Sequence, residues 1–95
     1  MDVRIRAQMS AIDGQWCLYV IVPSVPASQW PEREWDTGAP VPTLAQRRQA
    51  LAGLGFELVC GEEWQWFEQD ADDPSAPVRF IAMADVQEFP HPVAA

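Results

Sequence analysis

Hydrophobic and polar residues alternate from Val3 to Ile12, which is the period of a β-strand with one face toward water. Asp13-Gly14 follows directly, and an Asp-Gly pair between two strand-like segments is the strongest short-range signal of a β-hairpin. We therefore predict a second strand from Gln15 to Val22. Both alternating sets of residues in this strand are hydrophobic, so we expect a central strand that is covered on both faces.

The segment that follows Pro42 has the signals of a capped helix. Thr43 and Gln46 form a capping box, in which each side chain accepts a hydrogen bond from the backbone of the other residue. Gly55 suits the left-handed position that ends a helix. The hydrophobic stripe of this helix is narrow and includes an arginine. Its members are Leu44, Arg48, Leu51 and Ala52, with Leu54 at the end.

Three further strands are expected after the helix, and they complete a single α+β domain over residues 1–89. Their predicted ranges are 56–60, 63–69 and 78–86. The architecture is β-β-α-β-β-β: a twisted, mainly antiparallel sheet with one helix on one face. A lone helix cannot cover both faces of five strands, so a loop or a second copy must cover the other face. We therefore predict a homodimer, and a frayed tail at residues 90–95.

A long connection rich in proline and tryptophan separates the second strand from the helix. It spans residues 23–42, and its prolines forbid a regular helix or a central strand. Connections of this length are uncommon unless they are functional or contain short hidden elements. Trp30 and Trp35 flank Glu32, Arg33 and Glu34. The two indoles either fold down as a lid over the uncovered sheet face or form an exposed recognition surface.

Composition narrows the possible partners. The chain has 95 residues and a net charge of −8, from 14 acidic residues against six basic ones, all arginine. This charge repels phosphate backbones, so we expect no direct nucleic-acid binding and, if anything, a basic or aromatic-rich protein partner. No stretch approaches the length that crosses a bilayer, and no signal peptide is readable. The protein is expected to be cytoplasmic.

Candidate catalytic and metal-binding residues are few. Cys17 and Cys60 fall inside predicted strands, where we expect buried, reduced and inert thiols. The only histidine, His91, lies between two prolines in the predicted tail. The acidic turn at residues 70–77 lacks the glycine and the closing glutamate of a calcium loop. We therefore predict no enzyme activity, no metal site and no cofactor.

Two pairs of residues remain as candidates for ligand binding. Arg47 and Arg48 are the only adjacent cations, and we expect them to be solvated and to pair with carboxylates such as Glu32 or Glu34. The alternative is a guanidinium site for an anionic ligand. Trp64 and Trp66 are spaced to share one strand face, where they form core or cross-strand pairs or, alternatively, a stacking platform.

Segments spread along nearly the whole chain resemble one family. They read RAQMS, GQWCLYVIV, WPEREW, APVPT, RRQALAGLGFE, EWQW and PVRFIAMADV. In this combination the chain is similar to short actinobacterial proteins, found in streptomycetes, that are catalogued only as a domain of unknown function. The resemblance implies a cytoplasmic actinobacterial protein, and it supplies no catalytic residue.

Three functions are consistent with these patterns. The first is a non-catalytic protein-binding module that uses the segment from Trp30 to Trp35. The second is a small-molecule binder with an apolar pocket and an arginine for an anionic group. Its walls would be Trp30, Trp35, Trp64 and Trp66, with Arg47 or Arg48 as the anion site. The third is an acidic mimic of nucleic acid that occupies a DNA-binding protein through the carboxylates of residues 62–73.

Overall fold

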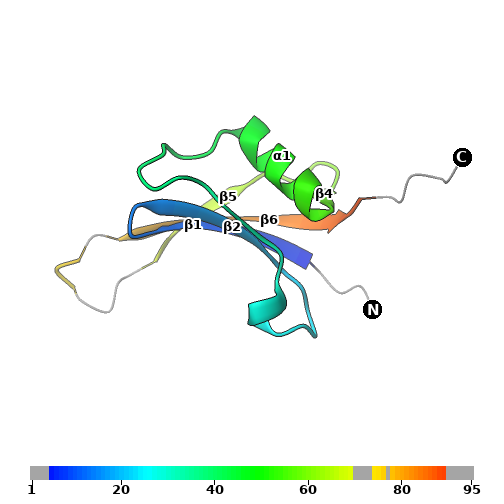
Figure 1. Cartoon of the computed structure of the whole chain (residues 1–95), viewed down its shortest axis with the longest axis horizontal. Helices are drawn as coiled ribbons and strands as arrows, with labels where there is room; N and C mark the ends of the chain where they lie inside the picture. The colour runs from blue at the N-terminus through cyan, green and yellow to red at the C-terminus, as the bar shows by residue number, and fades with distance from the viewer. Residues whose placement is uncertain (1–4, 70–73, 77, 90–95) are drawn as a thin grey trace, which may run out of the picture.

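The computed structural model describes residues 5–69, 74–76 and 78–89, which form one α+β domain (Figure 1). In chain order the elements are β1 (Ile5–Ile12), β2 (Gln15–Ile21), the 3-10 turn η1 (Ala27–Gln29), β3 (Glu32–Glu34), α1 (Leu44–Leu54), β4 (Phe56–Leu58), β5 (Gln65–Gln69) and β6 (Arg79–Glu88). The predicted β-β-α-β-β-β fold is confirmed. The difference is η1 and β3, two short elements inside the connection that we predicted to be irregular.

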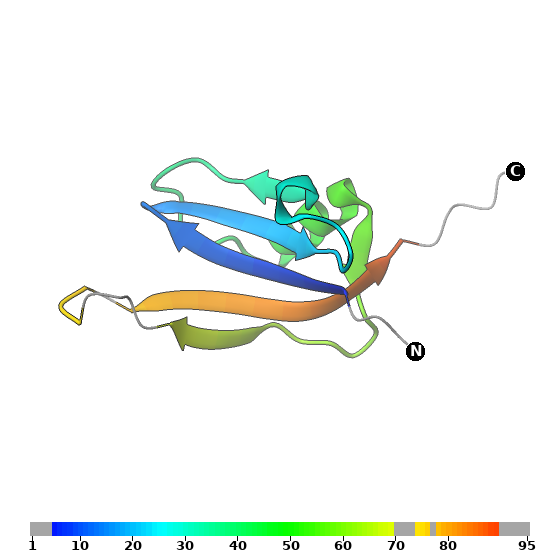
Figure 2. The same cartoon turned by 90° about the horizontal axis from the view of Figure 1, so that it is seen from below.

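All strand pairs described in the sheet are antiparallel. The order is β3-β2-β1-β6-β4, and β5 also pairs with β6. Along β6, residues 79–83 pair with β5 and residues 86–88 pair with β4. The β1–β2 hairpin turns at Asp13 (φ 52°) and Gly14 (φ 78°), as the Asp-Gly pair predicts. Figure 2 shows the sheet from the side opposite α1.

Both predicted ends of the helix are confirmed. The Thr43 hydroxyl accepts a hydrogen bond from the Gln46 amide at 3.1 Å, and the Gln46 side chain accepts one from the Thr43 amide at 2.8 Å. Gly55 adopts φ 92°, where a residue with a Cβ is strained, and its N–H donates to Ala52. This turn places Phe56 in the core immediately after the helix.

Of the four residues that were predicted to form the hydrophobic stripe of the helix, only Leu51 is buried. Leu44 is 62% exposed, and Arg48 and Ala52 also face solvent. The buried residues are Arg47, Ala50 and Leu51. The buried side is rotated because Arg47 packs inward against two indole rings, which a pattern that counts arginine as polar does not anticipate.

The core lies between α1 and one face of the sheet. Its buried members are Ala7, Met9, Leu18, Val20, Leu51, Phe56, Ala82 and Val86. Trp16, Trp35 and Trp64 pack against this cluster and are partly buried. The other sheet face, which we call the open face, carries the residues that alternate with the core positions. No described helix is long and apolar enough to cross a membrane.

Several strand ends differ from their predicted positions, and three of them differ by two residues. β4 stops at Leu58, so Cys60 lies in an exposed turn and its predicted burial is wrong, whereas Cys17 lies in β2 as predicted and is half-buried. The chain turns here because Gly61 takes φ 82°. β5 begins two residues later than predicted, and β6 continues to Glu88. Residues 1–4, the predicted tail at 90–95 with His91, and most of the acidic turn at 70–77 lie outside the described residues.

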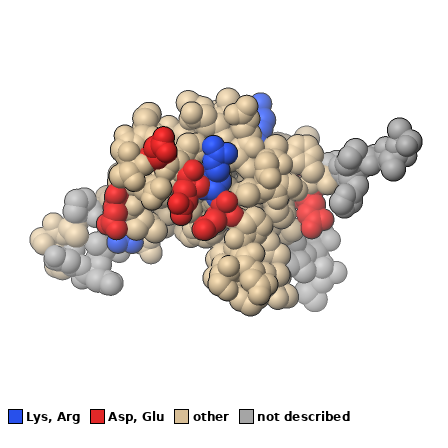
Figure 3. All heavy atoms as spheres, viewed as in Figure 1, with Lys and Arg blue, Asp and Glu red and all other residues tan. Residues whose placement is uncertain are grey.

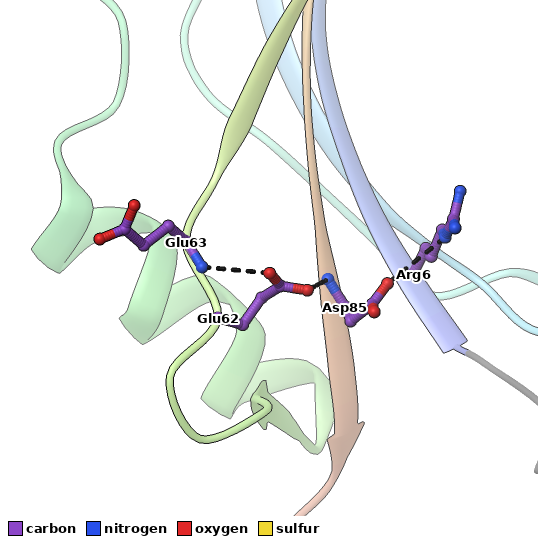
Figure 4. Close-up of polar contacts among 4 residues, drawn as sticks. All are labelled: Arg6, Glu62, Glu63 and Asp85. Atoms are coloured by element: carbon purple, nitrogen blue, oxygen red, sulfur yellow. Dashed lines mark hydrogen bonds and ion pairs between the residues drawn. The ribbon is translucent and has the colours of Figure 1, made fainter.

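A glutamate side chain completes the hydrogen bonding of β6 between β5 and β4 (Figure 4). Val59 N–H donates to the Asp85 carbonyl at 3.1 Å, and the Glu62 carboxylate accepts from the Asp85 amide at 2.9 Å. The same carboxylate accepts from the Glu63 amide at 3.2 Å, while the Asp85 carboxylate pairs with Arg6 at 3.3 Å. Glu62 thus supplies the acceptor that a neighbouring strand would otherwise provide.

Replacing Glu62 with alanine should lower the free energy of unfolding by about 1–3 kcal/mol, because the Asp85 amide loses its acceptor. Glu62→Gln keeps an amide oxygen in reach and should cost less. Glu63→Ala is the matched control, since that side chain is exposed, and it should change stability by no more than about 0.5 kcal/mol. Urea denaturation measures all three. Equal losses for Glu62→Ala and Glu63→Ala would contradict this role.

Candidate functional site: an arginine between two indoles

The most unusual buried residue in the described structure is Arg47, which is only 7% exposed. Its Nε donates to the Pro42 carbonyl at 2.9 Å. Its Cζ lies 5.5 Å from the ring centroid of Trp64 and 5.4 Å from that of Trp66, within the range of cation–π attraction. Trp66 in turn meets Trp16 edge to face at 6.1 Å. The guanidinium therefore connects α1 to the sheet.

The expectation that Arg47 is solvated and paired with a carboxylate is wrong, whereas Arg48 is exposed as predicted. Neither arginine forms an ion pair with Glu32 or Glu34. The physical reason is the neighbourhood of the helix. Two indole rings next to Arg47 accommodate both its aliphatic stem and its guanidinium. A guanidinium is weakly hydrated, so this environment suits it better than the strongly hydrated ammonium of a lysine.

Burial leaves the charge of Arg47 incompletely compensated. Desolvation lowers the pKa of Arg47 from its ordinary value, although an arginine stays protonated at neutral pH. A guanidinium donates through Nε, Nη1 and Nη2, and only the Nε–H has an acceptor on the protein. The N–H groups of Nη1 and Nη2 lack a protein acceptor within the described residues. An anion would supply both the acceptors and the opposite charge.

A cavity of about 360 Å³ lies beside this guanidinium, between α1 and the β4–β5 connection. We call it the aromatic pocket. It is lined by Leu44, Arg47, Arg48, Leu58, Glu62, Glu63, Trp64 and Trp66. Cavities of this size with apolar walls and a few polar groups are typical of small-molecule sites. Arg48 and Glu63 are exposed at its rim, and no ion pair joins them in the structure.

The four tryptophans predicted to wall one pocket are divided among three places. Trp64 and Trp66 come together at the aromatic pocket. Trp30 lies over Tyr19 on the open face, with ring centroids 5.9 Å apart, and its Nε1 donates to the carbonyls of Val22 and Val25. Trp35 packs against the core on the opposite face, because alternate residues of β3 and its extension point to opposite sides. Only Trp30 matches the position expected of a lid.

The charged residues between these two tryptophans remain at the surface. Glu32, Arg33 and Glu34 are all exposed, and the Arg33 guanidinium lies 5.6 Å from the Trp35 ring centroid. On the face seen in Figure 3, acidic side chains gather near the middle next to a basic one, and further acidic and basic side chains lie toward the edges.

β3 also brings two carboxylates next to Cys17, a grouping that sequence reasoning missed because it did not predict this strand. Glu34 pairs with Cys17 across the sheet, and ligand atoms of Cys17, Glu32 and Glu34 lie within 4.8 Å of one another. Burial raises the pKa of the Cys17 thiol, and the two carboxylates raise it further. The arrangement therefore favours the protonated thiol over the thiolate, and the thiolate is the form that acts as a nucleophile.

The fold and this site define a small α+β domain in which one capped helix and a pair of indoles enclose a buried arginine. The chain belongs to DUF6303, a family of unknown function, whose family model matches residues 3–94. The resemblance to a domain of unknown function is thereby confirmed. The same comparisons found no match among curated proteins and none among solved structures.

Arg47→Ala should lower the free energy of unfolding by about 2–3 kcal/mol, since it removes the packed stem and both cation–π contacts. Arg48→Ala, one residue further along α1, is the control and should stay within about 0.5 kcal/mol of the native protein. Thermal or urea unfolding measures the difference. Similar effects of the two substitutions would show that Arg47 does not hold the helix to the sheet.

Proposed function

We propose that the protein is a non-catalytic binding module whose aromatic pocket holds a small apolar molecule with one carboxylate. The observation that carries the proposal is the buried Arg47 guanidinium, whose Nη1 and Nη2 donors have no protein acceptor in the described structure and which lines a cavity of about 360 Å³. Among the described residues, no side-chain nitrogen or oxygen that is buried from solvent lacks a hydrogen-bond partner, so Nη1 and Nη2 reach the cavity, where a bound molecule can accept hydrogen bonds from them.

The chemistry of the lining defines the class of ligand. A carboxylate matches a guanidinium fork in two parallel hydrogen bonds, and Arg48 adds a second positive charge at the rim. Leu44, Leu58 and the two indoles offer an apolar surface for the rest of the molecule. Glu63 stands at the same rim, and its negative charge disfavours a dianion such as a phosphate monoester. A monoanionic carboxylate therefore fits best.

The proposal is tested with a matched pair of probes, 4-phenylbutyrate and its neutral amide, 4-phenylbutyramide. The carboxylate should bind at least about tenfold more tightly, because only it offers a charged partner to the guanidinium. Titration followed by the indole N–H signals in ¹H–¹⁵N spectra measures both affinities. The signals of Trp64 and Trp66 should move, while that of Trp30, whose Nε1 is bonded to Val22 and Val25, should not.

Two variants sharpen this experiment without relying on the fold-critical Arg47. Arg48→Gln should weaken the binding of the carboxylate probe and leave the binding of the amide probe unchanged. Glu63→Gln should strengthen the binding of the carboxylate probe, since each substitution changes one charge at the rim. Equal affinity of the two probes, or shifts at Trp30 and Trp35 in place of Trp64 and Trp66, would contradict the assignment.

The other functions predicted from the sequence remain proposals with less structural support. Protein binding through Trp30 and Trp35 has the exposed charges of β3 available, but the two indoles lie on opposite faces of the sheet. Acidic mimicry of nucleic acid relies on residues 62–73, where Glu62 is engaged by backbone amides and residues 70–73 lie outside the described structure. An actinobacterial source and a cytoplasmic location are further expectations of the resemblance.

A further inference from the structure

The open face of the sheet carries hydrophobic residues among its polar ones, and Phe67 on this face is 48% exposed. The register of the strands places its residues in rows that run across the sheet. One row is Glu34, Cys17, Ser10, Ile81 and Phe67. The next is Glu32, Tyr19, Gln8, Met83 and Gln65. Hydrophobic residues of β2 and β6 thus lie on either side of the polar residues of β1.

A protrusion stands on one side of β1. The turn η1 rises from the open face on the side of β2 and β3 (Figures 1 and 2). It is fixed there because Trp30, the next residue, stacks on Tyr19 and donates to the Val22 carbonyl. The exposed residues of η1 are small or polar: Ala27, Ser28 and Gln29.

A hollow lies on the other side of β1, between β6 and the start of β5. It has a volume of about 280 Å³ and is lined by Arg6, Glu62, Gln65, Phe67, Met83, Ala84 and Asp85. Figure 4 shows part of its polar border, where Arg6, Asp85 and Glu62 follow one another. The hollow and the protrusion lie at the same level along β1. Gln8 of β1 pairs on one side with Met83, which lines the hollow, and on the other side with Tyr19, on which Trp30 stacks.

We propose that the open face is the interface of a symmetric homodimer whose twofold axis runs parallel to β1. A rotation about that axis exchanges the two sides of β1 and keeps each row at its own level. The turn η1 of one copy then enters the hollow of the other. Cys17 and Trp30, which covers Tyr19, then lie against Ile81 and Met83 of the partner, so hydrophobic side chains meet across both halves of the interface.

The open face suits a second copy better than other occupants because it is complementary to itself. The protrusion and the hollow lie at the same level on opposite sides of one strand, which is the arrangement that an isologous interface needs. The small or polar residues of η1 also suit the polar part of the hollow, which is formed by Arg6, Glu62, Gln65 and Asp85. Nucleic acid does not fit, since Glu32 and Glu34 border the face at the β3 edge.

Sedimentation equilibrium of the full chain should give a dimer with twice the 10.7 kDa mass of one chain at micromolar concentration. Two phenylalanines make a matched test. Phe67 is 48% exposed and lies on the open face, while Phe80 is 51% exposed and lies on the other face of the same hairpin. Phe67→Glu should raise the dimer Kd at least about tenfold, whereas Phe80→Glu should leave it unchanged.

A crosslinking experiment tests the direction of the axis. In a Cys17→Ser, Cys60→Ser background, Gln8→Cys places one thiol per copy next to the twofold axis, and a short bis-maleimide should join the two chains. Gln49→Cys on the exposed side of α1 is the control and should stay uncrosslinked. A native monomer at micromolar concentration, a dimer broken by Phe80→Glu and not by Phe67→Glu, or equal crosslinking at both cysteines would overturn the proposal.

Discussion

The structure depends on one cation held between two indoles. The guanidinium of Arg47 reaches from α1 to Trp64 and Trp66, while its Nε bonds the Pro42 carbonyl just before the helix. These contacts fix the helix to the β4–β5 connection and hold that connection against the sheet. They also leave Nη1 and Nη2 turned to a cavity. The same interaction therefore stabilises the fold and creates the feature on which the proposed carboxylate site rests.

A second constraint is that one helix of this length covers only one face of the sheet. On that face, buried residues of β1, β2 and β6 form the core with Leu51 and Phe56. On the open face, Trp30 and the turn before it are the only cover that residues 5–69, 74–76 and 78–89 supply. The proposed carboxylate site and the proposed dimer interface thus lie on opposite sides of the sheet. Glu62 lines both cavities, and its carboxylate accepts a hydrogen bond from the Asp85 amide.

The sequence predicted those parts of the fold that depend on interactions between residues close together in the chain. The capping box at Thr43, the glycine that ends the helix and the Asp-Gly hairpin are each decided by a few adjacent residues, and all are confirmed. Contacts between distant residues decided the rest. Arg47 is buried because Trp64 and Trp66 lie beside it, and Trp30 and Trp35 separate because an unpredicted strand, β3, adds to β2. No sequence window contains those contacts.

The position of the Arg47 guanidinium is the most direct test of this account. Side-chain N–H signals of arginine, observed in ¹H–¹⁵N spectra at low temperature, report both ring currents and rotation about Nε–Cζ. The account predicts that Arg47 signals are shifted upfield and that their rotation is slow, because indole faces enclose the group, while Arg48 gives the averaged signals of an exposed arginine. Indistinguishable signals for Arg47 and Arg48 would contradict it.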